Sequence, residues 1–249
     1  MLKICPPLRA ASVKRGHSGS LVSATQFDEG TCWRGTLVPA AGELSACFGS
    51  VAVVRGVSSD APSDLEKCAK DRLRRAQKRI RRFAVANRLN RLITLTFEFR
   101  PESDRVAVGE VSRFFRRVTY RFPRVPYVWT LEFGEQTRRV HAHALVGGLD
   151  ATFLDSKWPL GRTDHVVYDL DATSLRTAAG YLANDLDRGP LHGGQAYRVA
   201  KGFQPEGISL RGLRDPRSVI WEASHLMGAD PTSVDDSARG ASLTAYWDV

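Results

Sequence analysis

The chain has 249 residues, enough to bury the core of one ordinary domain with extensions or of two small domains. Its 36 basic and 27 acidic residues give a formal net charge of +9, which favours a polyanionic partner. Four scattered cysteines without a CxxC pair argue against a zinc ribbon and against a disulfide framework. Pro6 and Pro7 interrupt the N-terminus before a signal peptide can form, and no apolar run reaches membrane-spanning length. We therefore expect a reduced, cytoplasmic protein with no membrane partner.

Residues 1–62 are rich in Gly, Ser, Ala and Pro and lack sustained hydrophobic periodicity, so the sequence predicts a poorly ordered N-terminal extension. An amphipathic basic helix is predicted next, over residues 63–87. Its apolar positions recur at steps of three and four residues: Leu65, Ala69, Leu73, Ala76, Ile80, Phe83 and Ala84.

The predicted helix carries most of the excess positive charge, because eleven basic residues and one acidic residue lie between Lys67 and Arg91. A solvated helix face is one interpretation of such a charge run. However, unbalanced positive charges repel one another unless an anion lies nearby, and Lys and Arg side chains bind nucleic acid by displacing its counterions. We therefore expect DNA contacts from this helix, made by Arg74, Arg75, Arg79 and Arg82.

The remainder of the chain is predicted to form strands and helices separated by Pro and Gly. Alternation with a period of two predicts strands, and apolar steps of three and four predict helices. The predicted strands cover residues 91–99, 127–133, 139–146, 165–170 and 208–211, and the predicted helices cover 108–122, 172–186 and 217–227. A turn at residues 134–137 joins two of the strands into a hairpin. This order predicts an α+β fold in which helices cover a central antiparallel sheet.

Two histidines lie two residues apart on the strand predicted at 139–146. Alternate residues of a strand project to the same face, so His141 and His143 could share one metal ion. Hairpin parity places Glu132, on the preceding strand, opposite or diagonal to His141. Two imidazoles and a carboxylate would leave open positions for substrate oxygens.

Simpler interpretations of these residues exist. Two histidines on a sheet face are often hydrogen-bonded residues of a core or a surface. Glu132 could form a salt bridge with Arg138 or Arg139, and Glu135 in the predicted turn is a rival ligand.

Three segments together resemble the HUH endonucleases, and within them the rolling-circle replication initiators of phages and plasmids. Residues 92–97 (LITLTF) resemble the first motif of that family, and residues 132–143 (EFGEQTRRVHAH) resemble the phage form of the second motif. Residues 178–184 (AAGYLAN) are similar to the third motif. Three motifs in the right order are far more specific than any one of them.

The resemblance implies a ferredoxin-like HUH sheet in the βαβββα order, with Glu132, His141 and His143 holding Mg²⁺ or Mn²⁺. It implies that Tyr181 attacks single-stranded or hairpin origin DNA, leaving a 5′-phosphotyrosine and a free 3′-hydroxyl that primes replication. A host helicase and polymerase would be partners, in a bacterial cell that carries the phage or plasmid. The nicking domain would span residues 63–212, followed by a C-terminal extension over 213–249 with a short helix.

The chain departs from the family pattern after the tyrosine. The family commonly has a lysine three residues later and often a second tyrosine at the fourth, whereas this chain has Asn184 and Asp185. We therefore expect a single-tyrosine enzyme, in which Lys201 replaces the lysine from elsewhere in the site. Tyr197, Arg198 and Lys201 are also expected to contact DNA, since rings stack on bases and cations follow the backbone.

Two other functions remain open. A DNA-binding protein with a degenerate, non-cleaving HUH site would explain the missing lysine and second tyrosine. A zinc hydrolase would use the histidines without forming a covalent DNA complex.

Overall fold

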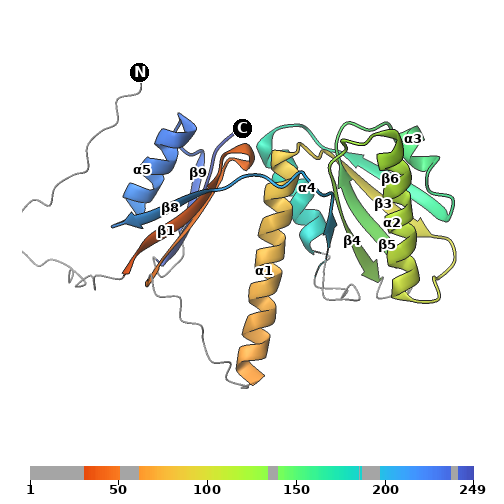
Figure 1. Cartoon of the computed structure of the whole chain (residues 1–249), viewed down its shortest axis with the longest axis horizontal. Coiled ribbons are helices and arrows are strands. Elements are labelled where there is room, and N and C mark those ends of the chain that lie inside the picture. Colours follow the sequence, from red (N-terminus) through yellow and green to blue (C-terminus); the bar gives the residue numbers. More distant parts are fainter. Residues whose placement is uncertain (1–30, 51–61, 134–139, 185, 187–196, 237–240) are drawn as a thin grey trace, which may run out of the picture.

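Two antiparallel sheets and five α-helices make up the part of the chain that a computed structural model describes, which is residues 31–50, 62–133, 140–184, 186, 197–236 and 241–249 (Figure 1). Each sheet has five strands, so the predicted α+β class is confirmed. Every helix within these residues is too short or too polar to cross a membrane.

The first sheet follows the predicted order and has the strand arrangement β6-β3-β5-β4-β7, with antiparallel pairing throughout. Its strands are β3 (Arg91–Phe97), β4 (Tyr127–Phe133), β5 (Val140–Val146), β6 (Gly161–Val167) and β7 (Arg198–Val199). The associated helices are α1 (Pro62–Ala86), α2 (Asp104–Arg121), α3 (Ala151–Asp155) and α4 (Ala172–Asn184). The predicted βαβββα order is therefore present, with the short helix α3 as an addition.

Helices cover both faces of this sheet. Helix α2 packs Phe114 and Phe115 on one face, against a cluster that includes Trp129 and Leu131. Helices α1 and α4 pack on the other face, where their side chains bury Leu92, Val128 and Leu145. Figure 1 shows α2 and α4 on opposite sides of the sheet. We call the side that faces α4 the α4 face.

Strand β6 begins four residues earlier than the predicted strand at 165–170. Gly161 has a φ of 154° and pairs with Phe97, and a Cβ atom on Gly161 would lie 2.1 Å from the carbonyl oxygen of Thr96. Only glycine tolerates this close approach of two backbones. The consequence is that Arg162 lies directly opposite Thr96.

The second sheet is absent from the sequence-based prediction. Its strand order is β8-β1-β2-β10-β9. The strands are β1 (Thr31–Val38), β2 (Glu43–Ser50), β8 (Ile208–Leu213), β9 (Ser233–Asp236) and β10 (Ser242–Tyr246), with the 3₁₀ helix η1 (Pro39–Ala41) and helix α5 (Pro216–Met227). Residues 31–50 were expected to be poorly ordered but form a hairpin, because alternate residues such as Trp33 and Leu37 bury against α5 and β10. The remainder of the predicted extension, residues 1–30 and 51–61, lies outside the described residues.

The C-terminal part of the chain likewise differs from a simple extension. The predicted helix is present as α5, while β9 and β10 complete the second sheet, and β8 pairs with β1 rather than with the first sheet. The second sheet thus joins strands from both ends of the chain.

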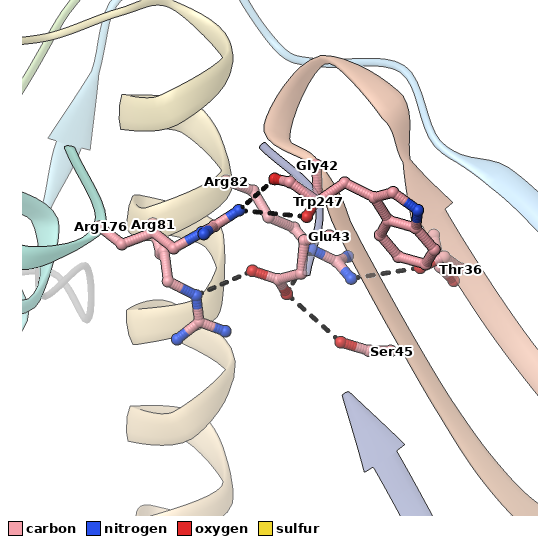
Figure 2. Close-up of polar contacts among 8 residues, drawn as sticks. All are labelled: Thr36, Gly42, Glu43, Ser45, Arg81, Arg82, Arg176 and Trp247. Carbon is pink, nitrogen blue, oxygen red and sulfur yellow. Dashed lines mark hydrogen bonds and ion pairs between the residues drawn. The ribbon is translucent and has the colours of Figure 1, made fainter. Parts of the chain in front are cut away.

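A buried carboxylate joins the second sheet to α1 (Figure 2). Glu43 is 1% exposed and accepts hydrogen bonds from Nε of Arg81 (2.8 Å) and from Nε of Arg82 (3.0 Å). Burial by itself would raise the pKa of Glu43, but the hydrogen bond and charge of Arg81 and the charge of Arg82 outweigh it and hold that pKa below its ordinary value. Arg176 of α4 adds a second link, because its guanidinium donates to the backbone oxygens of Gly42 (3.3 Å) and Trp247 (2.7 Å).

Candidate functional site

Polar side chains occupy one end of the α4 face in two cross-strand rows. The first row contains Arg162, Thr96, His141 and Glu132, and the second contains Asp164, Thr94, His143 and Thr130. The next row toward α1 is apolar, with Val166, Leu92, Leu145 and Val128. The face therefore changes from apolar core to polar site between neighbouring rows.

Threonines of β3 fix the orientation of both histidines. The Thr94 hydroxyl hydrogen bonds with Nδ1 of His143, and the Thr96 hydroxyl with Nδ1 of His141, each at 3.1 Å. Because each Nδ1 is engaged by β3, Nε2 is the ring nitrogen that a metal ion would use. Partners of this kind commonly set the tautomer and ring orientation of metal-binding histidines.

Glu132 completes the group as hairpin parity predicts. It lies directly opposite His141, and its Oε2 is 2.8 Å from Nε2 of His143 on the diagonal. A hydrogen bond at this distance needs one proton between the imidazole and the carboxylate. The rival residues Glu135, Arg138 and Arg139 lie outside the described residues, as does the predicted turn at 134–137.

The donor types fit a divalent cation, since two imidazole nitrogens and one carboxylate oxygen share one face. The spacing shown is that of the hydrogen-bonded pair, and the ring centroids of His141 and His143 are 6.4 Å apart. Within the described residues, no group of three or more His, Cys, Asp or Glu side chains already has a spacing that could hold a metal ion. A bound cation would therefore have to take the place of the proton that Glu132 and His143 share.

Tyr181 lies beside this group. Helix α4 buries Ala178, Ala179 and Leu182 against the sheet, which leaves Tyr181 at the rim with 53% of its surface exposed. Its ring stands edge to face with that of His143, at 6.1 Å between centroids. The structure thus brings together the four residues that the sequence selects, Glu132, His141, His143 and Tyr181.

Residues 90–189 match the family model of the replication-associated proteins of the ORF2 type. The matched segment contains the two polar rows and Tyr181, and it covers less than half of the chain. No curated protein and no solved structure shows significant similarity to the chain. The family match supports a replication-associated, Rep-type protein, and every residue of the candidate site lies inside it.

Lys201 lies outside the matched segment and at the far end of β4 from the site. The N–H of Ala200 donates to the carbonyl of Tyr127 at 2.9 Å, so Lys201 follows the start of β4. Glu132 lies near the other end of that strand, about 16 Å away at the usual rise per residue. Asn184 is exposed one turn after Tyr181. The cation nearest to the site in strand register is Arg162, in the first row.

The residues expected to bind DNA have different surroundings. Arg74, Arg75 and Arg79 are exposed on α1, the N-terminal half of which projects beyond the sheets in Figure 1. Arg82 instead pairs with the buried Glu43. These placements favour the first three as surface contacts.

Two residues of the predicted 197–201 cluster also differ from expectation. Arg198 lies on the α2 side of the sheet, with its guanidinium 5.8 Å from the centre of the Trp129 ring and 3.5 Å from the Ser112 hydroxyl. Tyr197 is half-buried against the cluster under α1 and α4. Trp129 itself is 1% exposed, which confirms its predicted place in the core.

Thr94, Thr96 and Arg162 are site residues that the sequence-based prediction missed. The two threonines stand out only as the polar half of an alternating strand, and their role depends on the register between β3 and β5. A TxT pattern on one strand with an HxH pattern on another is the signal that could have suggested the pairing. Arg162 needed the correct start of β6, which Gly161 sets.

Proposed function

We propose that the chain is a replication initiator that nicks single-stranded origin DNA by attack of Tyr181 and later rejoins it. The observation that carries this proposal is the edge-to-face placement of Tyr181 on His143, beside Glu132, within a segment that matches a replication-associated family. An exposed tyrosine next to a histidine–carboxylate pair has no evident packing role.

In this proposal Glu132, His141 and His143 hold Mg²⁺ or Mn²⁺. The ion supplies Lewis-acid charge that reduces the repulsion between a phosphodiester and an incoming nucleophile. Thr94 and Thr96 keep the imidazoles oriented, so the site needs little reorganisation when DNA binds.

Tyr181 then carries the covalent chemistry. Its phenolic oxygen forms a bond to the scissile phosphorus, the bond from phosphorus to the 3′ oxygen breaks, and the phenolic proton leaves to solvent while the 3′ oxygen takes up a proton. The products are a 5′-phosphotyrosine and a free 3′-hydroxyl. Attack of a 3′-hydroxyl on the phosphotyrosine reverses the exchange and releases Tyr181.

Single-stranded or hairpin DNA is the substrate class that suits an exposed site at the rim of a sheet. The 3′-hydroxyl would serve a polymerase, and strand separation would need a helicase, so both enzymes are proposed as host partners. A cytoplasmic location follows from the same role.

The test uses a pool of single-stranded oligonucleotides of random sequence, incubated with the full chain and Mn²⁺ or Mg²⁺. We expect a denaturant-resistant protein–DNA adduct that disappears in Tyr181→Phe and persists in the matched control Tyr168→Phe. Chelation of the cation should also abolish the adduct. A wild-type chain that forms no adduct with any sequence in the pool would refute the nicking proposal.

A DNA-binding protein with a degenerate site is the second candidate. The specific observation in its favour is Asn184, which stands where the family commonly has a lysine. Retained binding of single-stranded DNA together with the absence of any adduct would support it.

A further inference from the structure

Helix α2 carries a row of cations on the surface that points away from the sheet. Residues at steps of three and four lie on one face of a helix, and here that face contains Arg113, Arg116, Arg117, Tyr120 and Arg121. The buried residues Val111, Phe114, Phe115 and Val118 follow the same kind of steps on the opposite side and face the sheet. The helix is therefore apolar toward the core and strongly basic outward.

The basic face of α2 borders an open groove of about 960 Å³. The far wall comes from helix α3 and the residues after it, with Phe153, Ser156, Lys157 and Pro159. Among the residues that the structure describes, no acidic side chain lines the groove. We call this surface the α2 groove.

Charges in the α2 groove are mostly unneutralised by protein. Glu110 pairs with Arg113, whereas the described residues provide no ion pair for Arg116, Arg117, Arg121 or Lys157. Arg117 donates to the carbonyl of Lys157 (3.1 Å), which ties the two walls together and keeps both cations at the groove. Cations held this close together favour an anion with repeated charges.

An exposed aromatic ring lies among these charges. Tyr120 is 92% exposed, the most exposed large apolar side chain among the described residues. The ring is flanked along the helix by Arg116, Arg117 and Arg121. Rings interleaved with cations suit a nucleic acid strand with unpaired bases, since a base can stack on the ring while phosphates follow the cations.

We propose that the α2 groove is a binding surface for single-stranded nucleic acid, separate from the site around Tyr181. The two surfaces lie on opposite sides of the first sheet, because α2 covers one face and α4 covers the other. The α2 groove would therefore hold a segment of strand other than the one at Tyr181. Binding here requires no cleavage, so the inference stands independently of the nicking proposal.

The test measures binding of an oligothymidylate of about 16 nucleotides to the full chain by fluorescence anisotropy, over a range of salt concentrations. Tyr120→Ala should weaken binding by about 5- to 150-fold, and Tyr120→Phe should restore it, because the stacking surface is retained. The double variant Arg116→Ala/Arg121→Ala should reduce the slope of log affinity against log salt by about 0.7 for each phosphate left without a cation. Arg217→Ala, on the exposed side of α5, is the matched control and should leave both quantities unchanged.

A second readout does not depend on affinity. An oligothymidylate with 5-iododeoxyuridine, irradiated in the complex, should crosslink to the peptide that contains Tyr120. Unchanged binding in both α2 variants would overturn the proposal. Tighter binding of a duplex of equal length, or equal binding of polyglutamate, would also overturn it, because either result would assign the groove to a different partner.

Discussion

His143 and Tyr181 stand edge to face between strand β5 and helix α4, with their ring centroids 6.1 Å apart. The imidazole is 6% exposed and is held by Thr94 and Glu132, whereas the phenol is 53% exposed. A fixed, shielded ring is thus next to an accessible nucleophile. This relationship suits a metal-assisted attack on a substrate that arrives from solvent.

The threonine partners should control metal affinity. Thr94→Val and Thr96→Val keep the side-chain shape but remove the hydroxyl that engages each Nδ1. Loss of such a partner typically costs about 10- to 100-fold in metal affinity. Mn²⁺ titration followed by electron paramagnetic resonance should show a loss of this size, while Thr152→Val, an exposed change on α3, should behave as wild type. Unchanged affinity in both β3 variants would contradict the metal assignment of His141 and His143.

Arg162 and Lys201 should differ in their effect on cleavage. Arg162 is in the same row as His141 and Glu132, so it can meet a phosphate bound at the site, whereas Lys201 lies beyond the start of β4. We expect Arg162→Ala to slow adduct formation by about tenfold, the size of one lost charge-assisted hydrogen bond, and Lys201→Ala to change it by less than about twofold. The measurement is the single-turnover rate of adduct formation. The reverse order would restore Lys201 as the replacement for the family lysine.

Glu43 should stabilise the contact between the second sheet and α1. Glu43→Gln leaves Arg81 and Arg82 without their carboxylate, which typically costs about 3 kcal/mol or more in the free energy of unfolding. Urea unfolding at neutral pH measures this loss, with the exposed change Glu206→Gln as control. Because the folded pKa of Glu43 is lowered, its contribution is present above pH 4.5 and is lost as the pH falls through the lowered value. The difference between wild type and Glu43→Gln should therefore shrink in acid, and a constant difference would contradict the ion-pair account.

Lys78 should make stability depend on pH in the alkaline range. Burial, followed by the charge of Arg82, lowers the pKa of Lys78 to about 8 from an ordinary 10.5. Between about pH 8 and 10.5 the unfolded chain binds a proton at this position that the folded chain does not, so stability from this residue rises with pH. Urea unfolding should show that Lys78→Met is more stable than wild type at pH 7, and that this advantage declines by about pH 10. An advantage that grows with pH would have the wrong sign.

Local patterns were sufficient to predict the hairpin and its polar group. The prolines before β4 fix where the strand begins, and the alternation of His141 and His143 with apolar residues fixes which side faces α4. Parity alone then placed Glu132 correctly, since both strands repeat every two residues. Tyr181 depended on the family resemblance, because helical periodicity equally allows a core aromatic.

The second sheet shows what local patterns could not reveal. Strands β1 and β2 pair with β8 and β10, which lie at the other end of the chain. Pairing between such distant segments leaves no local signal, and Gly-rich neighbours obscure the short alternation around Trp33. The same limit explains Arg82, which the sequence assigns to a DNA-binding face and the structure pairs with Glu43.

The central claim is that Tyr181 becomes covalently attached to DNA, and mapping of the attachment site tests it most directly. Trypsin releases residues 177–188, and the only tyrosine in that peptide is Tyr181. After reaction with single-stranded DNA and Mn²⁺, followed by nuclease digestion, mass spectrometry should find this peptide carrying a nucleotide through a phosphodiester. A nucleotide on any other peptide, or an unmodified 177–188 peptide in a sample that contains covalent adduct, would contradict the account.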